Sequence, residues 1–291
     1  MTPLLILVTL AWGIGFITTK HAVAAVPPLT MIAMRFAFAS IILFLVFSFV
    51  GHDRFFPLKK GELKAGAILG IFLYACYGFQ AVGIQYTTVS HTGFITGLSV
   101  VFVPIIAAFL GQKINRFALS GILLSALGTF LLSKTDSLLP NYGDVLVLIA
   151  ACAVALHIVY VGRYAGSYSV SKITFIQIVT CTLLSIVTAF CFEDLAHYRP
   201  DLTVWVWSEL FFMGAVATAL AFVIQNAAQK YISPVKIALI FTFEPIFAAV
   251  FSVWLGLEVL STQQWTGGGL MLAGVLVAEI GPSLRFRRSV G

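Results

Sequence analysis

Charged residues are scarce in this sequence. Only 10% of its 291 residues are Asp, Glu, Lys or Arg, whereas soluble domains carry roughly 25%. Hydrophobic residues make up 60%, which is more apolar surface than a soluble fold of this length can bury. A lipid bilayer solvates such surface. The composition therefore excludes an ordinary soluble protein and predicts an integral membrane protein.

Cysteine is also rare, and catalytic motifs are missing from the sequence. The four cysteines lie within or at the end of apolar runs and form neither a CxxC pair nor a Cys/His metal pattern. There is no GxSxG, HExxH or Walker-type GxxxxGKS/T motif, and no cluster of acidic residues that would bind a metal. We therefore expect neither an enzyme nor an ATP-driven pump, and we expect no catalytic residue, cofactor or metal.

Long apolar runs fill the chain instead. A transmembrane helix needs about 20 apolar residues, so ten such helices with short loops account for the length. The predicted spans are residues 3–20, 30–50, 65–84, 90–111, 117–133, 143–161, 172–192, 204–228, 235–256 and 264–281. Because the runs are continuous and do not alternate as strands would, they predict an all-α membrane protein and exclude a closed β-barrel.

Lysine and arginine are distributed unevenly between the two sides of the membrane that these spans define. Thirteen lie on the side that carries the C-terminus, and three lie on the other side. Since cytoplasmic loops are enriched in basic residues, both termini are predicted to be cytoplasmic, in a multi-pass protein of the cell membrane such as a bacterial inner membrane. The net charge of +6 is explained by this topology, and we expect no nucleic-acid partner.

The two halves of the chain align with each other at offsets of 142 to 146 residues. The matching positions are 34–36 with 176–178, 86–88 with 231–233, and Gly121 and Gly128 with Gly267 and Gly274. Because each half has five spans, an odd number, the halves must be inserted in opposite orientations. We predict ten transmembrane helices as two inverted five-helix repeats, residues 1–136 and 137–291, an architecture typical of transporters.

A proline lies within the fourth span of each half, Pro104 in the first and Pro245 in the second. A proline inside a helix removes a backbone donor and frees the carbonyl four residues earlier. Interrupted helices of this kind border the substrate sites of many transporters. Both prolines are therefore candidates for a role in gating, although each could also be a kink that neighbouring helices repair.

Five short motifs occur in order along nearly the whole chain. They are Ala11-Trp12-Gly13 with Phe16, Met34-Arg35-Phe36, Tyr86-Thr87-Thr88, Glu244-Pro245 and Leu272-Ala273-Gly274-Val275-Leu276. Together they resemble the EamA family of the drug/metabolite transporter superfamily. The resemblance implies a ten-helix secondary transporter of small organic molecules, often amino acids or related metabolites, commonly moving them outward. The first half has Ser99-Val100 in place of Glu244-Pro245, so any role of that acid is confined to one half.

Charged and titratable groups inside a membrane are costly and therefore point to function. Glu244 is the only acidic residue near the middle of a predicted span, and it could carry a coupling proton or hold the ninth helix in place. Arg35 could bind a carboxylate through two N–H groups, reach the membrane surface, or bond freed backbone carbonyls. His91 and His157 lie within spans, and each could gate or relay a proton or simply bond a neighbour.

Aromatic and amide side chains within the spans are candidates for lining a substrate cavity together with Arg35. They are Trp12, Tyr77, Gln80, Tyr160, Gln177, Gln225 and Asn226. We interpret the protein as a secondary transporter of small metabolites, with amino acids as the best guess and protons as a candidate coupling ion. Drugs, amines and nucleosides are alternative substrates, and an embedded enzyme or a channel would need metal ligands or a filter motif. The expected partners are the substrate and the bilayer, with the chain as a monomer or homodimer.

Overall fold

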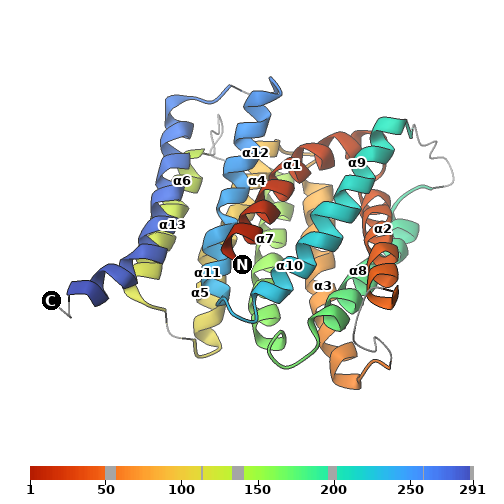
Figure 1. Ribbon diagram of the computed structural model, residues 1–291. Coiled ribbons are helices and arrows are strands. Elements are labelled where there is room, and N and C mark those ends of the chain that lie inside the picture. Colours follow the sequence, from red (N-terminus) through yellow and green to blue (C-terminus); the bar gives the residue numbers. More distant parts are fainter. Residues whose placement is uncertain (50–56, 113, 133–140, 196–201, 258, 289–291) are drawn as a thin grey trace.

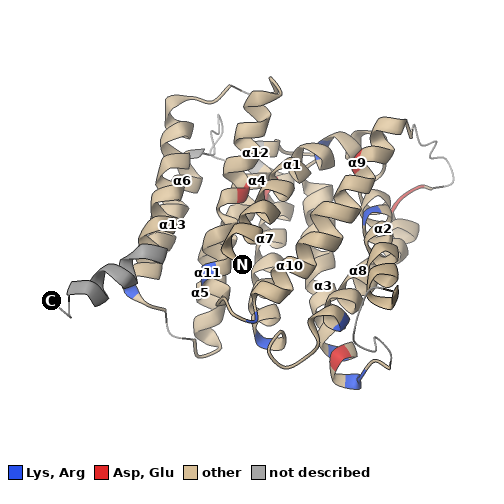
Figure 2. Ribbon diagram, in the orientation of Figure 1, with Lys and Arg blue, Asp and Glu red and all other residues tan. Residues whose placement is uncertain are grey.

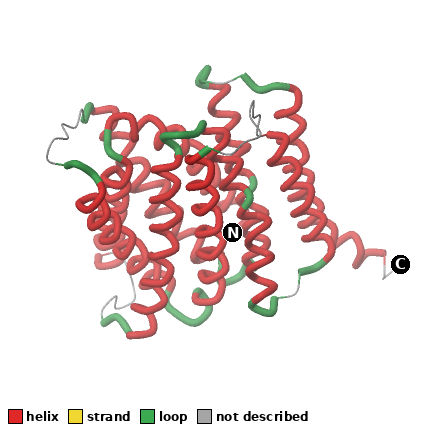
Figure 3. Tube along the Cα trace, turned by 180° about the vertical axis from the view of Figure 1, so that it is seen from behind, coloured by secondary structure: helices red, strands yellow, loops and turns green. Residues whose placement is uncertain are grey.

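The computed structural model describes residues 1–288 except 50–56, 113, 133–140, 196–201 and 258 (Figure 1). Side chains are described except for those of residues 90, 91, 132 and 279–288. Within this part of the chain there are helices and loops and no strands (Figure 3). The prediction of an all-α protein is confirmed for these residues.

The helices follow one another through short connections. In chain order they are α1 (Thr2–Ala25), α2 (Pro28–Phe49), α3 (Lys60–Gly83), α4 (Val89–Gly97), α5 (Ser99–Phe109), α6 (Arg116–Leu132), α7 (Tyr142–Tyr164), α8 (Val170–Phe192), α9 (Val204–Gly214), the π-helix η1 (Ala215–Leu220), α10 (Ala221–Ala228), α11 (Pro234–Phe241), α12 (Phe243–Trp254) and α13 (Thr262–Arg288). Eight helical segments of the described chain are long and apolar enough to cross a membrane. The protein is therefore a multi-pass membrane protein.

The fifth and tenth predicted spans correspond to α6 and α13, which are not among those eight segments. The helix α6 has 17 residues, fewer than the roughly 20 that a membrane crossing needs. The helix α13 continues past the predicted end at residue 281, while its described side chains stop at Ala278. The total of ten membrane crossings stays a prediction.

Two of the spanning segments are interrupted near their middle. The first interruption separates α4 from α5 at Leu98, and the second separates α11 from α12 at Thr242. Pro245 follows the second interruption closely and cannot donate a hydrogen bond to the carbonyl of Phe241. Pro104, by contrast, lies inside the helical backbone of α5. The expected interruptions are present, but Pro104 does not mark the first of them.

The two ends of the bundle differ in charge (Figure 2). One end, which we call the basic end, carries Lys59, Lys60, Lys64, Arg163, Lys172, Lys230 and Lys236, at the start of α3, α8 and α11 and the end of α7 and α10. At the opposite end Trp205 and Trp207 are exposed in the first turn of α9. Exposed tryptophans at helix ends are typical of the interface between membrane and water.

The helices α6 and α13 pack closely as a pair at one side of the bundle (Figures 1 and 3). Glycines make this approach feasible. A Cβ atom at Gly121 would lie 2.5 Å from the carbonyl oxygen of Gly274, and one at Gly128 would lie 2.5 Å from that of Gly267. Since real Cβ atoms do not approach so closely, the backbones of α6 and α13 touch through these small residues.

Candidate functional site

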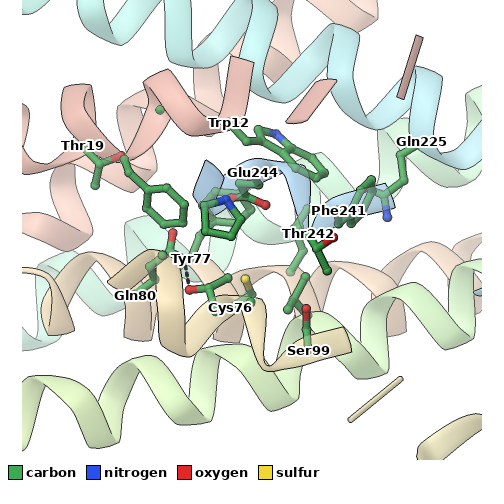
Figure 4. Close-up of a pocket in the computed structure, with 18 of the residues that line it drawn as sticks. Trp12, Thr19, Cys76, Tyr77, Gln80, Ser99, Gln225, Phe241, Thr242 and Glu244 are labelled. Atoms are coloured by element: carbon green, nitrogen blue, oxygen red, sulfur yellow. Dashed lines mark hydrogen bonds between the residues drawn. The ribbon is translucent and has the colours of Figure 1, made fainter. Parts of the chain in front are cut away.

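A cavity lined by apolar and polar side chains lies in the middle of the bundle (Figure 4). The space among its wall residues, including the part that is open to the outside, amounts to about 740 Å³. Its wall comes from α1–α5, α7 and α10–α12 and consists of Trp12, Gly15, Phe16, Thr19, Arg35, Leu73, Cys76, Tyr77, Gln80, Gly93, Thr96, Gly97, Ser99, Val154, Phe222, Gln225, Ala238, Phe241, Thr242, Glu244 and Pro245. Both helix interruptions therefore border the cavity.

Arg35 on α2 is fixed in orientation within the cavity wall. Its Nε donates a hydrogen bond of 2.7 Å to the Thr218 hydroxyl, and one terminal nitrogen donates to the Ala217 carbonyl at 3.2 Å. The guanidinium carbon also lies 4.5 Å from the centre of the Tyr77 ring, a favourable arrangement for a cation and an aromatic face. These contacts hold the charge inside the bundle, and Arg35 is only 3% exposed.

The π-helix η1 supplies the acceptor groups for this arrangement. A π-helical turn departs from the regular α-helical hydrogen-bond pattern, and such turns often occur at functional sites. The Ala217 carbonyl accepts a hydrogen bond from Arg35 and another of 2.8 Å from the indole nitrogen of Trp12. One backbone carbonyl thus joins α1 and α2 to the α9–η1–α10 segment beside the cavity.

Glu244 lies at the centre of the group drawn in Figure 4, between Trp12 and the side chains of Cys76 and Gln80. The residue is half-buried, and its carboxyl group has no hydrogen bond or ion pair within the described part of the chain. It interacts electrostatically with Arg35, but no nitrogen of Arg35 comes within 4.0 Å of its oxygens. One acid and one cation therefore face the same cavity without binding each other.

The rest of the wall is aromatic with a few neutral polar groups. The Trp12 ring lies 4.9 Å from that of Phe241 and 5.7 Å from that of Phe222, measured between centroids. Gln80 on α3 donates a hydrogen bond of 3.0 Å to Thr96 on α4 (Figure 4). Such a surface suits an organic molecule that has both apolar and polar parts.

The structure brings together seven of the residues that the sequence singled out. These are Trp12, Arg35, Tyr77, Gln80, Gln225, Glu244 and Pro245, and all of them line the cavity. Gln177, Asn226 and His157 lie outside it, in a separate buried cluster. Tyr160 packs against Phe72 and Tyr164 and also lies away from the cavity. Pro104 is buried within α5, and the side chain of His91 lies outside the described residues.

Several wall residues were not anticipated from the sequence. They include Thr19, Cys76, Thr96, Ser99 and Thr242, which line the cavity, and Thr218, which holds Arg35. Serine and threonine within helices often bond their own backbone, as Thr242 does with the Leu239 carbonyl, so their presence in a span carries little information. The available sequence signals were the alignment of Ser99 with Glu244 and the position of Thr242 shortly before Pro245. No group of three potential metal ligands occurs among the described residues.

A many-helix membrane bundle with interrupted helices beside a central cavity is typical of membrane transporters. The profile of the EamA-like transporter family matches residues 2–134 and again residues 141–279. The chain belongs to this family, and it is a transporter and not an enzyme.

Similar proteins agree with this assignment. An uncharacterized transporter of Archaeoglobus fulgidus is 30% identical over 278 residues, which cover 95% of this chain and 84% of the relative. The uncharacterized inner membrane transporter YedA of Escherichia coli K12 is 26% identical over 285 residues, which cover 94% and 88%. A solved crystal structure superposes with a TM-score of 0.80 at 18% identity and covers 96% of this chain and 95% of its own. At that identity the superposition shows the fold alone.

Proposed function

We propose that this transporter carries small zwitterionic metabolites, most simply amino acids, out of the cell by alternating access. The observation that carries the proposal is the presence of Arg35 and Glu244 in one cavity without an ion pair between them. A zwitterion has one anionic and one cationic group, and the cavity offers one partner for each. The aromatic wall supplies a surface for an apolar side chain.

Arg35 is suited to the carboxylate of such a substrate. A guanidinium has five N–H groups, and the hydrogen bonds to Thr218 and Ala217 occupy two of them. The remaining N–H groups are sufficient for a paired interaction with a carboxylate, for which the planar guanidinium is well shaped. The contact with the Tyr77 ring fixes the plane in which that pairing occurs.

Glu244 is suited to the ammonium group, or to a coupling proton when the substrate is absent. A carboxyl group without a protein partner binds either cation at the same oxygens. Competition between proton and substrate at one carboxylate would couple their movements in opposite directions, as an exporter driven by proton entry requires. Because the first half has Ser99 at the corresponding position, this role belongs to one half alone.

Alternating access is supported by signs of an inverted repeat. The family profile matches the chain twice in succession, and the helix interruptions at Leu98 and Thr242 are separated by nearly the same offset as the aligned motifs. The glycine contacts also fit a two-fold axis. Gly121 contacts Gly274, and Gly128 contacts Gly267. Because Gly121 aligns with Gly267 and Gly128 with Gly274, replacing each glycine by its aligned counterpart converts the first contact into the second. Two such halves can rock about a shared site.

The direct test is resistance and counterflow. Overexpression in a bacterial strain challenged with toxic amino acid analogues should raise resistance to at least one analogue, and purified protein in proteoliposomes should exchange the corresponding amino acid. Arg35→Ala should abolish both effects, because it removes the partner of the carboxylate. Arg163→Ala, at an exposed position on the basic end, is the matched control and should retain both.

Different results would redirect the substrate assignment. If no analogue and no amino acid is transported while an amine, a nucleoside or a drug gives counterflow, the zwitterion proposal is wrong and the transporter assignment stands. Equal loss of activity in Arg35→Ala and Arg163→Ala would show that the effect is not specific to the cavity.

A further inference from the structure

A second group of polar side chains is buried next to the cavity, on the side of the basic end. We call it the polar ring, and it consists of His157 on α7, Thr174 and Gln177 on α8, Gln225 and Asn226 on α10, and Gln229, which directly follows α10. All six side chains are buried. Gln225 also lines the cavity, so the ring adjoins the cavity directly.

Hydrogen bonds connect the three helices of the ring in a closed circuit. His157 and Gln177 join α7 to α8 at 3.1 Å. The Asn226 amide donates to the Thr174 hydroxyl at 2.8 Å and so joins α10 to α8. The Gln229 amide donates to the Ile158 carbonyl at 2.6 Å, which joins the end of α10 to α7. The ring therefore fastens these helices together between the cavity and the basic end.

The ring is nonetheless incompletely bonded. Five buried side-chain polar atoms in the described part of the chain have no hydrogen-bond partner, and four of them belong to the ring. They are Nδ1 of His157, Nε2 of Gln177, Oε1 of Gln225 and Oδ1 of Asn226. Buried polar atoms are nearly always paired, and leaving them unpaired is costly. A concentration of unpaired donors and acceptors in one place indicates groups that bind something else in another state of the protein.

The alignment of the two halves indicates what that state is. At an offset of 142 residues Gln177 corresponds to Arg35, and at an offset of 145 Gln225 corresponds to Gln80. Arg35 and Gln80 line the cavity. Two members of the polar ring thus occupy, in the second half, positions that form part of the cavity wall in the first half.

We propose that the polar ring is a second substrate-binding surface, which opens toward the basic end when the two halves exchange conformations. This inference rests on the proposed transport function. The opened ring presents amide and imidazole groups with no fixed charge such as Arg35 carries, and it would bind the neutral hydrogen-bonding parts of a substrate. The substrate carboxylate would consequently be held more strongly while the Arg35 side of the site is open.

Thiol labelling tests the opening without knowledge of the substrate. Cys76, Cys152 and Cys191 are replaced by alanine, Cys181 is kept, and Gln177→Cys is added. A polar maleimide that does not cross membranes is then applied to vesicles in which the basic end faces outward. Rapid labelling of Lys230→Cys, an exposed position, verifies that orientation. We expect Gln177→Cys to react steadily and Cys181, equally buried one turn further along α8, to stay unreacted until denaturation.

A change in the ring should alter that rate. Gln229→Leu removes the bond to the Ile158 carbonyl and should speed labelling at position 177 roughly fivefold, the effect of one hydrogen bond. An amino acid that gives counterflow should slow labelling at position 177 and leave Lys230→Cys unaffected. If Gln177→Cys does not fold, Thr174→Cys, also in the ring, replaces it.

Several results would overturn the inference. One is labelling at position 177 no faster than at Cys181 in protein that performs counterflow, because the transport function would then hold while the ring stays closed. Another is an absence of protection by a transported substrate, which would show that the ring opens but does not bind it. If the protein shows no amino acid counterflow, the proposal of an amino acid substrate is wrong. The opening of the ring is still tested by the labelling rate at position 177, because labelling needs no substrate.

Discussion

Arg35 is a charged residue held inside a membrane protein by neutral groups. Its guanidinium is fixed by the Thr218 hydroxyl, the Ala217 carbonyl and the Tyr77 ring. Glu244, the acidic residue of the same cavity, forms no ion pair with it. Burying a charge without its counter-ion is expensive. Under the proposed function the remaining N–H groups of Arg35 bind the substrate carboxylate, and lysine, a point charge without the planar fork, would not replace it.

Glu244 gives a prediction about pH. Glu244→Gln keeps the size of the side chain but cannot bind and release a proton, so the variant should fold and reach the membrane at normal levels. Its transport rate should lose the dependence on pH that the wild type shows. Counterflow measured across the neutral pH range checks this. Asp194→Asn, at an exposed position outside the cavity, should keep the wild-type pH profile.

Two outcomes would contradict the coupling role. A Glu244→Gln variant with an unchanged pH profile would exclude this carboxyl group as the proton carrier. A variant that is absent from the membrane would support the alternative in which Glu244 holds the α11–α12 segment in place.

The sequence identified the charged members of the site more readily than the neutral ones. A lone arginine or glutamate within an apolar run stands out because its transfer into lipid is unfavourable. Gln80 and Gln177 have the same chemistry and both are buried, yet only Gln80 lines the cavity. A helix in a membrane is apolar on the faces that meet lipid and on the faces that meet other helices, so periodicity does not reveal which way an amide points.

The π-helix η1 illustrates what the sequence leaves open at the scale of an element. Its residues, Ala-Val-Ala-Thr-Ala-Leu, include no glycine or proline that would announce an irregular turn. Two donors from other helices, Trp12 and Arg35, meet at its Ala217 carbonyl. Because the partners lie about 200 positions away in the chain, only the assembled bundle shows why the turn is there.

The contact between α6 and α13 gives a prediction about stability. Gly128→Ala places a Cβ atom where the Gly267 carbonyl oxygen would be 2.5 Å away. The two helices must separate or shift, which should cost about 1–3 kcal/mol and lower the midpoint of thermal unfolding in detergent. Gly268→Ala is the matched control, since a Cβ atom at Gly268 meets nothing within 4 Å.

The control should be neutral or slightly stabilising, because alanine favours a helix more than glycine does. Equal unfolding midpoints for Gly128→Ala and Gly268→Ala would mean that α6 and α13 are not in close contact in the membrane. The sequence showed that Gly121 and Gly128 align with Gly267 and Gly274, but it did not show that the two helices contact each other.

At the scale of the whole molecule, composition predicted a helical membrane protein because no other environment accommodates so much apolar surface. The positions of the loops followed from polar and proline-rich breaks between the runs. The fifth span, predicted at residues 117–133, agrees with α6 (Arg116–Leu132) within one residue at each end. How the helices pack around the cavity depends on contacts between distant parts of the chain.

The charge of the basic end predicts the orientation of the molecule. Thirteen basic residues against three on the two sides should place both termini in the cytoplasm. A reporter enzyme or fluorescent protein fused after Gly291 should therefore be active as a cytoplasmic fusion. A reporter that is active only outside the cytoplasm would reverse the orientation and, with it, the face of the membrane toward which the polar ring opens.

The pairing of α6 with α13 also bears on how the protein is made. The chain is synthesised from its N-terminus, so α6 enters the bilayer long before α13 has been translated. During that interval the glycine face of α6 has only lipid as a neighbour, and its main partner arrives as the last helix described. A chain that ends before residue 262 would therefore contain every residue of the cavity wall and yet leave α6 without its main partner.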